Sequence, residues 1–462
     1  MALANDVRLK KLFKQILKDI KPTQKEISDV NEYSNELMAR LKEVAPKDVE
    51  IILAGSLARG TQVRGKSDID IFLLFPRNLE ERKMEAKAIS LAKRIVRNEF
   101  GEYYEINYAE HPYLKLINKR RSLNADIVPA FKINDADEMA TSVDRTQLHN
   151  VFVLKNLDAK QKDDVRIIKY LLQRHNIYGA ESSRHAFSGY LCELLVCYYG
   201  SAENVLKAFS EAKIPIYINL YKKDADASAA AEASRHFNAP LIVIDPTDKN
   251  RNVAASVSIE SLSRLILISR NLLANPAKKE FYGPMYSDED PVKSIEEFRR
   301  AKGASIQAMC FKLPKISEDT LWPQLEKLRG RIVRELEQSG FGIALSFSRI
   351  EYGKGVIVFL PAYDRLNTIK RIGPDVTIIG AAEKFARAHG SALSVSVEGS
   401  RLIAIDKPAN ADVLGALQGI ILDKKFKFTP DIKKSAVKIA NNELSEDYAL
   451  IVYHGLVEKL GI

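Results

Sequence analysis

The apolar residues of this chain repeat with two different spacings, and the change from one to the other marks its first structural elements. Residues 7–20 place apolar side chains on one helical stripe, and a second helix is predicted over 24–44. The spacing then shortens, and compact apolar runs at 49–53 and 68–72 predict two strands. Between these strands the small residues Ala54-Gly55-Ser56 predict a tight turn. We therefore expect two helices followed by a strand, turn, linker and strand.

The pattern returns to helical spacing after the second strand. Apolar and charged residues alternate over 78–100, which predicts an amphipathic helix lying on the sheet. The polar run 118–121 predicts a turn between residues 104–108 and a third strand at 124–131. A mostly helical region is predicted next. Its elements are helices at 163–175, from 187 onward, at 222–238 and at 259–274, with one strand at 240–244.

The last third of the chain predicts an α+β fold. Residues 277–304 look irregular, and the order beyond them is the β-α-β-β-α-β order of a ferredoxin-like sandwich. The predicted elements are a strand at 304–313, a helix at 318–338, strands at 342–349 and 356–361, a helix at 381–389, strands at 393–397 and 402–405, and a helix at 411–422. We expect a multidomain α/β and α+β protein, divided into residues 1–150, 151–275 and 276–462.

The second predicted strand carries two carboxylates. Asp68 and Asp70 alternate with isoleucines, so the carboxylates share one face while the isoleucines point into a core. Neighbouring carboxylates repel each other, and a divalent cation such as Mg²⁺ between them relieves the repulsion. In the preceding turn, Gly55 lets the backbone approach a ligand closely, and Ser56 donates to a phosphate. A phosphate cradle beside metal-binding carboxylates predicts nucleotide chemistry.

Each of these features alone has an ordinary structural explanation. A Gly-Ser turn before a strand is usually only a turn, and an Asp-x-Asp pair is often a solvated strand face. Asp126, just before the apolar run 127–131, is by itself more often a strand-entry residue than a ligand. The order and spacing of Gly-Ser and Asp-x-Asp together favour the functional interpretation.

Composition narrows the class of protein. The chain has 462 residues, 46% of them hydrophobic, which is enough for two to four domains. A net charge of +10 suits a polyanionic partner without requiring one. The spacing of Cys192, Cys197 and Cys310 argues against a zinc site or a disulfide framework. With no signal segment and no long uncharged apolar run, the sequence predicts a soluble, cytoplasmic protein.

Several motifs carry a resemblance to one family. Gly-Ser-Leu-Ala-Arg-Gly-Thr at 55–61 and Ser-Asp-Ile-Asp-Ile-Phe-Leu-Leu-Phe-Pro at 67–76 resemble the archaeal (class I) CCA-adding tRNA nucleotidyltransferases of the polymerase-beta-like superfamily. Val-Arg-Ile-Ile-Lys, Ile-Tyr-Gly-Ala-Glu, Phe-Ser-Gly-Tyr-Leu-Cys-Glu and the Asp-Pro with Arg-Asn-Val-Ala-Ala near residue 250 resemble the same family. The resemblance covers residues 10–275 and, more loosely, the rest. It implies a polymerase-beta-like catalytic domain, a helical central domain and a C-terminal tRNA-binding region.

The resemblance also implies a metal site. Asp68, Asp70 and Asp126 would hold two Mg²⁺ ions roughly 3.5 to 4 Å apart. Many archaeal members have Glu where this chain has Asp68. The shorter side chain keeps the charge and moves its oxygens back by one methylene.

Nucleotide contacts are implied by the same resemblance. Ser56, Arg59, Lys169 and Tyr178 would clamp the triphosphate, with Gly55 beside them. Without the resemblance, Lys169 and Tyr178 would be interpreted as surface residues.

Three further residues would complete the nucleotide site. Thr146 and His149 would contact the triphosphate or the sugar, although a helix cap and a surface histidine explain them equally well. Arg251 would contact base and phosphate, because its fixed donors match the acceptors of cytosine and adenine.

The implied activity is template-independent addition or repair of the 3′-terminal CCA of tRNA from CTP and ATP, with release of pyrophosphate. The expected partners are the tRNA 3′ end and acceptor arm, CTP and ATP, and no membrane. The oligomeric state, a homodimer included, is left open by the sequence. The basic run 424–438 is a candidate for phosphate-backbone contact and equally for a solvated loop.

Two alternatives share these carboxylates. One is another template-independent RNA nucleotidyltransferase, such as a poly(A) polymerase, which would accept ATP alone on varied primers. The other is a noncatalytic RNA-binding relative with a degenerate site. The blocks around Tyr190 and Arg251 argue against the first, and the presence of three carboxylates argues against the second.

Overall fold

The computed structural model describes residues 2–65, 68–108, 111–179, 185–221, 227–278, 281, 290–314, 316, 318–351, 353–433, 437–441 and 444–460. The chain forms two compact units, Met1–Gly283 and Pro284–Ile462. No helix within these ranges has both the length and the apolar character needed to cross a membrane.

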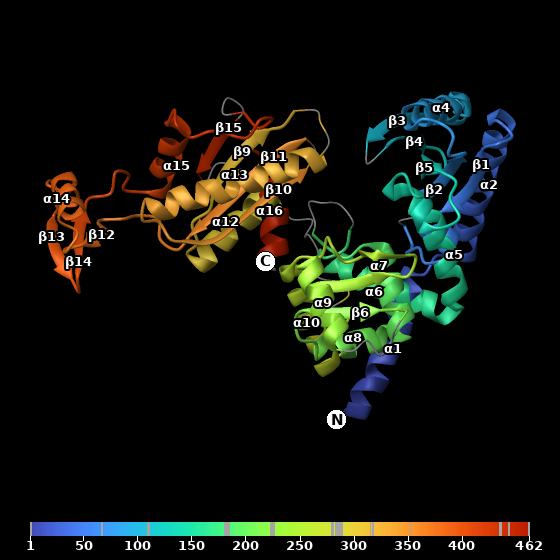
Figure 1. The fold of residues 1–462 in the computed structure, drawn as a ribbon, viewed down its shortest axis with the longest axis horizontal. Helices are drawn as coiled ribbons and strands as arrows, with labels where there is room; N and C mark the ends of the chain where they lie inside the picture. Colours follow the sequence, from blue (N-terminus) through green and yellow to red (C-terminus); the bar gives the residue numbers. More distant parts are fainter. Residues whose placement is uncertain are drawn as a thin grey trace. The chain divides into compact units, whose positions relative to one another are not determined.

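The first unit contains a five-stranded sheet in the order β1-β2-β5-β4-β3 (Figure 1). Its strands are β1 (Glu50–Ala54), β2 (Asp68–Phe75), β3 (Glu102–Tyr108), β4 (Pro112–Asn118) and β5 (Leu123–Phe131). Only β2 and β5 run parallel, and the other neighbouring strands are antiparallel. The structure confirms the three predicted strands as β1, β2 and β5, with Asp68 and Asp70 on β2 and Asp126 on β5. The sequence prediction missed β4.

Two helices cover one face of this sheet. They are α2 (Gln24–Val44) and α4 (Glu81–Arg94), whose apolar residues share a core with those of β2 and β5. The predicted bounds of α2 are correct, and a capping box between Thr23 and Glu26 starts it. The helix predicted over 78–100 is shorter than expected, since α4 ends at Arg94 and a separate 3₁₀ turn, η1 (Asn98–Phe100), follows.

A second core joins the N-terminal helix to the helices after the sheet. Helix α1 (Ala2–Ile20) packs on α6 (Ala159–Arg174) and α10 (Ile259–Ala274). The other elements of this region are η2 (Ala136–Glu138), η3 (Ser142–Arg145), α5 (Thr146–Asn156), α7 (Gly189–Tyr199), α8 (Ala202–Ser210), α9 (Ala227–Phe237) and a sheet of β6 (Ile216–Asn219), β7 (Leu241–Asp245) and β8 (Asp248–Asn252). The predicted bounds of α10 are correct.

The helices and strands of the second unit follow the predicted ferredoxin-like order. Some of the segments that form them differ from those predicted. Its four-stranded antiparallel sheet runs β10-β11-β9-β15. The successive elements are β9 (Gln307–Lys312), α13 (Glu318–Gln338), β10 (Ile343–Glu351), β11 (Lys354–Pro361), α15 (Val413–Leu422) and β15 (Val437–Asn441). The fourth strand is therefore β15, which the sequence prediction missed.

The segments predicted to finish the sandwich form a separate sheet. Strands β12 (Ile369–Asp375), β13 (Ser394–Glu398) and β14 (Arg401–Asp406) pair in the order β12-β14-β13, and α14 (Ile379–Ala388) packs on β12 and β14. This piece is inserted between β11 and α15. The prediction was wrong in assigning it to the sandwich.

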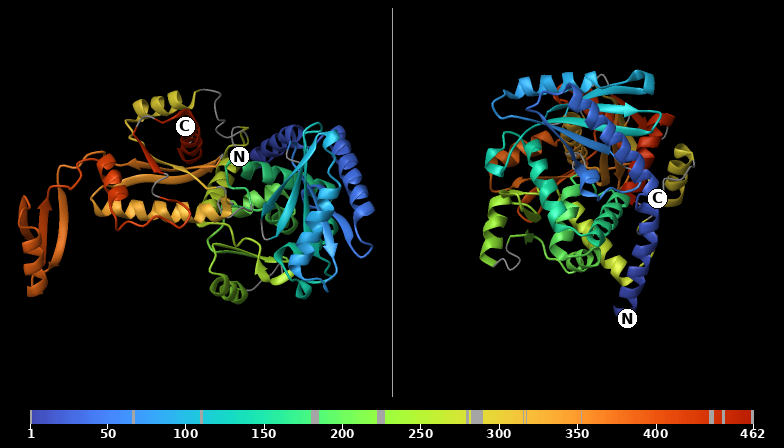
Figure 2. Two further views of the ribbon diagram at one scale, coloured as in Figure 1. Left: turned by 90° about the horizontal axis from the view of Figure 1, so that it is seen from above. Right: turned by 90° about the vertical axis from the view of Figure 1, so that its right-hand side faces the viewer.

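Helices lie on both faces of the four-stranded sheet (Figures 1 and 2). Residues of α13 and α15 form a core on one face. Helices α12 (Pro291–Lys302) and α16 (Glu446–Leu460) form a core on the other face. The segment 277–304 was predicted to be irregular, and α12 overturns that prediction for residues 291–302, where Asp290 caps a helix that has Pro291 in its first turn.

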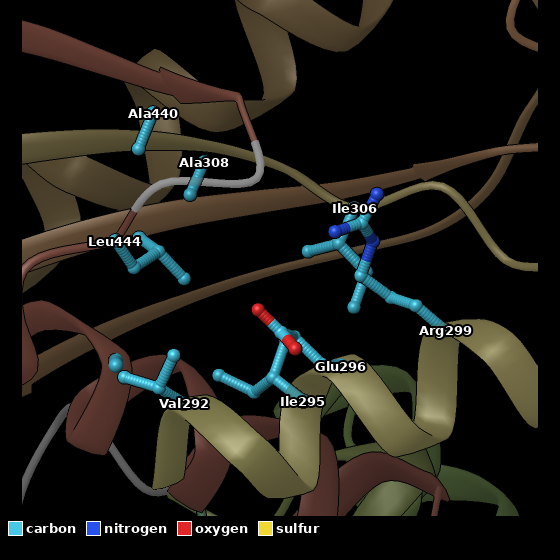
Figure 3. Close-up of a pocket in the computed structure, with 9 residues that line it drawn as sticks. Val292, Ile295, Glu296, Arg299, Ile306, Ala308, Ala440 and Leu444 are labelled. Carbon is cyan, nitrogen blue, oxygen red and sulfur yellow. The ribbon is translucent and has the colours of Figure 1, made fainter.

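A small pocket of the second unit lies among α12, β9, β15 and α16 (Figure 3). Its lining is mostly apolar, and Glu296 and Arg299 are its charged residues. It contains none of the predicted site residues.

Candidate nucleotide and metal site

The parallel pairing of β2 with β5 brings the predicted metal ligands together. Asp70 lies opposite Asp126 in this pairing, and Ala54 of β1 lies opposite Asp70 on its other side. Asp68 is exposed, whereas Asp70 and Asp126 are half-buried. The sheet therefore presents the three carboxylates at the start of two neighbouring strands.

The electrostatics of this cluster favour a cation. Burial raises the pKa of Asp70 to about 7, and the charges of Asp126 and Asp68 add to the shift. Burial also raises the pKa of Asp126, although Lys115 opposes this shift from a distance of 3.8 Å between its Nζ and Asp126 Oδ1. Asp126 Oδ1 is buried without a hydrogen-bond donor among the described residues. An acidic oxygen cluster with an unsatisfied buried oxygen fits a hard divalent cation.

Gly55 is fixed at this position by its close approach to Asp70. Its φ is +68°, and a Cβ added there would lie 1.7 Å from Asp70 Oδ2. The residues after it form a short helix, α3 (Gly55–Arg59), rather than the predicted turn. Ser56 therefore lies in the first turn of α3, next to the close contact between Gly55 and Asp70.

Two of the predicted triphosphate contacts meet at a buried carboxylate that sequence reasoning had not assigned. The ammonium group of Lys169 donates to Glu193 Oε1 over 3.0 Å, and Arg59 Nε lies 2.9 Å from Glu193 Oε2. Thr61 also donates to Glu193, and Arg59 donates to Asn150 over 2.8 Å. The surface interpretation of Lys169 is wrong, because this side chain is only 2% exposed and its charge is balanced by Glu193.

Lys169 and Tyr178 lie together at the start of α7. A Cβ added to Gly189 would meet the Tyr178 hydroxyl at 2.9 Å and Lys169 Cε at 3.5 Å. Ser188 caps this helix by accepting a hydrogen bond from the Leu191 amide. An ammonium group and a phenol beside a helix N-terminus suit a phosphate group.

A second buried carboxylate joins His149 to Arg251. Asp245 Oδ2 lies 3.1 Å from His149 Nε2 and accepts a hydrogen bond of 2.8 Å from Arg251 Nη1. The other oxygen, Oδ1, accepts hydrogen bonds from Thr247 and from the Tyr190 hydroxyl, and Tyr190 stacks on His149 with 3.7 Å between ring centroids. Burial would raise the pKa of Asp245, but its hydrogen bonds with His149 and Thr247 outweigh this and lower it.

By its residue pattern alone, the polar stretch that begins at Asp245 would normally be a surface turn, but Asp245 itself does not lie at the surface. Its side chain is completely buried, at the end of β7 and before the hairpin that leads to β8. The local signal is a single acidic residue directly after four apolar ones. Sequence alone gave no indication of partners as far away as His149.

The remaining predicted residue, Thr146, begins α5 directly after η3. The capping box of this region belongs to Thr141 and Asp144, so Thr146 is not its capping residue. Asp144 is fully buried and accepts a hydrogen bond of 2.7 Å from the Phe131 amide. This contact fixes the start of α5 against the end of β5.

One face of α7 links the two groups of contacts. Tyr190 and Glu193 are one helical turn apart and so lie on the same side of α7. Arg59, which contacts Glu193, also acts electrostatically on Asp70 and on His149. Arg59 and α7 therefore link the predicted metal ligands, the triphosphate candidates and the Arg251 group within the first unit.

Another mixed cluster lies apart from the predicted metal ligands. Glu81 and Glu85 are four residues apart on α4, and both face His111, whose Nδ1 lies 2.8 Å from Glu85 Oε1. The ligand atoms of the three residues lie within 4.8 Å of one another. A hydrogen bond between the histidine ring and a helix carboxylate explains the short contact, and His111 Nε2 is buried with no partner among the described residues.

Comparison with known proteins agrees with this geometry. The chain matches three family descriptions: "Nucleotidyltransferase domain" over residues 34–149, "tRNA nucleotidyltransferase, second domain" over 163–282, and "CCA-adding enzyme, C-terminal domain" over 302–435. It is 33% identical to a CCA-adding enzyme of Methanothermobacter thermautotrophicus over 86% of this chain and 85% of that protein. The chain belongs to the CCA-adding enzyme family.

A further relative in the CCA-adding enzyme family comes from Pyrococcus abyssi, with 35% identity over 76% of each chain. Among solved structures, a cytoplasmic RNA terminal U-transferase gives a TM-score of 0.46 at 18% identity, covering 59% of this chain and 98% of that one. The three predicted metal ligands fall in the nucleotidyltransferase match, and Lys169, Tyr178 and Arg251 fall in the second-domain match. As a CCA-adding enzyme family member, the protein is a multidomain nucleotidyltransferase whose catalytic domain is of a kind that depends on divalent metal ions.

Proposed function

We propose that this protein adds and repairs the 3′-terminal CCA of tRNA, using CTP and ATP without a nucleic-acid template and releasing pyrophosphate. The observation that carries the proposal is the register of β2 and β5, which sets Asp70 beside Asp126 with too little positive charge from the protein to balance them. Family membership supplies the tRNA substrate and the two nucleotides.

Asp68, Asp70 and Asp126 would hold two Mg²⁺ ions. Bound there, the ions lower the pKa of the primer 3′ hydroxyl and neutralise charge on the departing pyrophosphate. Gly55 keeps the backbone close enough to fix Asp70, and Ser56 follows it at the start of α3.

The triphosphate would bind beside Lys169, Arg59 and Tyr178. Two cations share the single carboxylate of Glu193, so one positive charge remains in excess for the phosphates. Because these cations are buried and held, they lose little conformational freedom when a phosphate arrives. Thr146, at the start of α5, would contact the triphosphate or the sugar.

Arg251 would contact the base. Its Nη1 is held by Asp245, while its side chain is one-third exposed. A guanidinium donates to the O2 and N3 acceptors of cytosine or to N1 of adenine. Uracil and guanine present an N–H donor at the matching ring nitrogen, which leaves two donors facing each other.

The tRNA would also contact the second unit. Lys424, Lys425 and Lys427 are exposed, while Phe426 and Phe428 between them pack against the core formed with α13. This alternation holds a row of cations on a fixed surface, as contact with a phosphate backbone requires. We keep the division into residues 1–150, 151–275 and 276–462, and a cytoplasmic location, as parts of this proposal.

The test uses tRNA transcripts that end before CCA, after C and after CC, each incubated with one labelled nucleotide. We expect CTP incorporation on the first two and ATP incorporation on the third. An RNA of random sequence serves as the control substrate. Extension with ATP alone, or equal extension of the random RNA, would show a poly(A)-polymerase-like activity and overturn the proposal. No extension of any substrate would support the noncatalytic alternative.

A further inference from the structure

Asp245 is a fully buried carboxylate to which the proposed reaction gives no direct task. It accepts hydrogen bonds from the Thr247 amide and hydroxyl over 2.9 and 2.8 Å and from the Tyr190 hydroxyl over 3.3 Å, all at Oδ1. Its Oδ2 lies within hydrogen-bond distance of His149 Nε2 and accepts a hydrogen bond from Arg251 Nη1. Two of the side chains assigned to the nucleotide, His149 and Arg251, therefore meet at one oxygen of one buried carboxylate.

This arrangement fixes the tautomer of His149. A carboxylate with this many donors around it is ionised and can only accept hydrogen bonds. The His149 nitrogen that faces it, Nε2, must therefore carry a proton. Burial lowers the pKa of His149, and Asp245 opposes this shift without cancelling it, which favours the neutral ring. A neutral ring with its proton on Nε2 leaves Nδ1 as a bare acceptor.

The ring cannot readily turn away from this orientation. Tyr190 stacks on it at an interplanar angle of 18°, and the Tyr190 hydroxyl is itself bonded to Asp245. Arg251 has its Nη1 bound at the same carboxylate, which restricts the plane of its guanidinium. Asp245 thus holds an acceptor and a set of donors in a fixed relation.

We propose that Asp245 is a positioning residue of the nucleotide pocket, which holds Arg251 as a donor and His149 as an acceptor for a hydrogen-bond donor of the incoming nucleotide. Two groups of CTP and ATP have this chemistry, the exocyclic amino group of the base and a ribose hydroxyl. This inference rests on the proposed function, since it assumes that the pocket receives CTP and ATP.

Asp245→Asn is the informative change because it keeps the shape and removes one acceptor. If the new amide NH₂ replaced Oδ1, it would face the Thr247 backbone N–H, which cannot change. We therefore expect the NH₂ to replace Oδ2, where it repels Arg251 and forces His149 to accept at Nε2. The histidine would then carry its proton on Nδ1, and the acceptor offered to the nucleotide would become a donor.

The kinetic test measures kcat and KM for CTP on a tRNA lacking CCA, with wild type, Asp245→Asn and the control Asp248→Asn. Asp248 lies in the same hairpin and pairs with Arg145 at 3.4 Å, without contacting His149 or Arg251. We expect kcat/KM to fall about 100-fold or more in Asp245→Asn, because reversal of a histidine tautomer in a hydrogen-bonded catalytic group costs up to about 10⁴-fold. We expect the control to change it less than about threefold.

Substrate analogues identify the nucleotide group. If the amino group is the donor, Asp245→Asn loses discrimination against UTP, and if the ribose hydroxyl is the donor, it loses discrimination against 2′-deoxy-CTP. In an Arg251→Ala background, Asp245→Asn should cost less than it does alone, because one of its two tasks is already gone. Unchanged discrimination against both analogues, or full additivity with Arg251→Ala, would overturn the proposal.

A spectroscopic measurement on wild-type protein tests the inference even if Asp245→Asn fails to fold. Nitrogen-15 NMR of wild-type protein labelled at its seven histidines distinguishes the two tautomers, and the His149 signal is assigned from its loss in His149→Gln. We expect the proton on Nε2. A proton on Nδ1, or on both nitrogens at neutral pH, would contradict the inference. If wild-type protein adds no CTP to tRNA, the proposed function fails, whatever this spectrum shows.

Discussion

Two groups of carboxylates lie in the first unit, and their surroundings shift their pKa values in opposite directions. Asp70 and Asp126 on the sheet have raised pKa values, because burial and repulsion by neighbouring carboxylates outweigh the nearby cations, which are Arg59 and Lys115 for Asp70 and Lys115 for Asp126. Glu193 and Asp245 are buried completely, and yet their pKa values are lowered, because neighbouring cations and donors outweigh the cost of burial. The first pair needs a cation from outside the chain, and the second pair already has its partners.

This difference separates two tasks that carboxylates perform in one site. A carboxylate that is fully paired within the protein stabilises the positions of its partners and has little affinity left for a ligand. A carboxylate that is buried and poorly paired carries a negative charge that the protein does not balance, and a divalent cation can bind to it. Pairing, more than burial, therefore distinguishes the proposed metal ligands from the proposed positioning groups.

The largest effect is expected from Asp70→Asn. Removing this metal ligand should reduce nucleotide addition by about 1000-fold or more, since metal stabilisation of the reaction amounts to several kcal/mol. Affinity for tRNA, measured by filter binding or anisotropy, should remain within about threefold of wild type because no phosphate contact is removed. Without added metal the variant should be at least as stable as wild type, because one repulsive charge is gone. A strong loss of stability would show that Asp70 is a paired carboxylate after all.

The next effect is expected from Glu193→Gln. This change leaves Lys169 and Arg59 buried without a counter-charge, so the free energy of unfolding should fall by about 3 to 5 kcal/mol. The control is Glu260→Gln on α10, where the exposed pair with Arg264 contributes at most about 0.5 kcal/mol. Urea unfolding of both variants checks the comparison. If triphosphate were bound to the folded variant, it should restore part of the lost stability by replacing the missing anion.

A further effect is expected in the pH dependence of stability. In the folded chain Asp70 keeps its proton up to about pH 7, whereas its ordinary pKa is 3.8. The folded state binds the extra proton between these values, so stability without divalent cation should fall as pH rises through this window. Denaturant titrations in EDTA should show the decrease in wild type and a smaller one in Asp70→Asn. Adding Mg²⁺ should stabilise wild type more at high pH than at low pH, and an equal gain at every pH would contradict this.

The sequence predicted well those features that depend on neighbours along the chain. The bounds of α2, α10 and α13 follow from helical apolar spacing together with local start signals, and they match the structure. The alternation in Asp68-Ile69-Asp70-Ile71 correctly placed both isoleucines in the core, where neither is exposed. Once the strands were predicted, we could also expect the strand that carries Asp126 to lie beside β2, as β5 does.

The sequence gave little information on contacts made across large separations. Lys169 is buried only because Glu193 meets it, and Asp245 is buried only because His149 and Arg251 meet it. Each of these residues has the polar character of a surface residue when considered alone. Strand β15 was missed for a similar reason, since its partner β9 lies more than a hundred residues earlier.

The position of β15 late in the sequence affects how the second unit folds during synthesis. It pairs with β9 along Gln307–Phe311, and all five of these β9 residues are buried. Until β15 arrives, β9 presents an open, apolar sheet edge, and such edges pair with other chains. Since β15 follows β9 by so long a stretch of chain, a ribosome must synthesise the whole insertion before the edge can close. The nascent second unit should therefore depend on protection against aggregation until β15 has been synthesised.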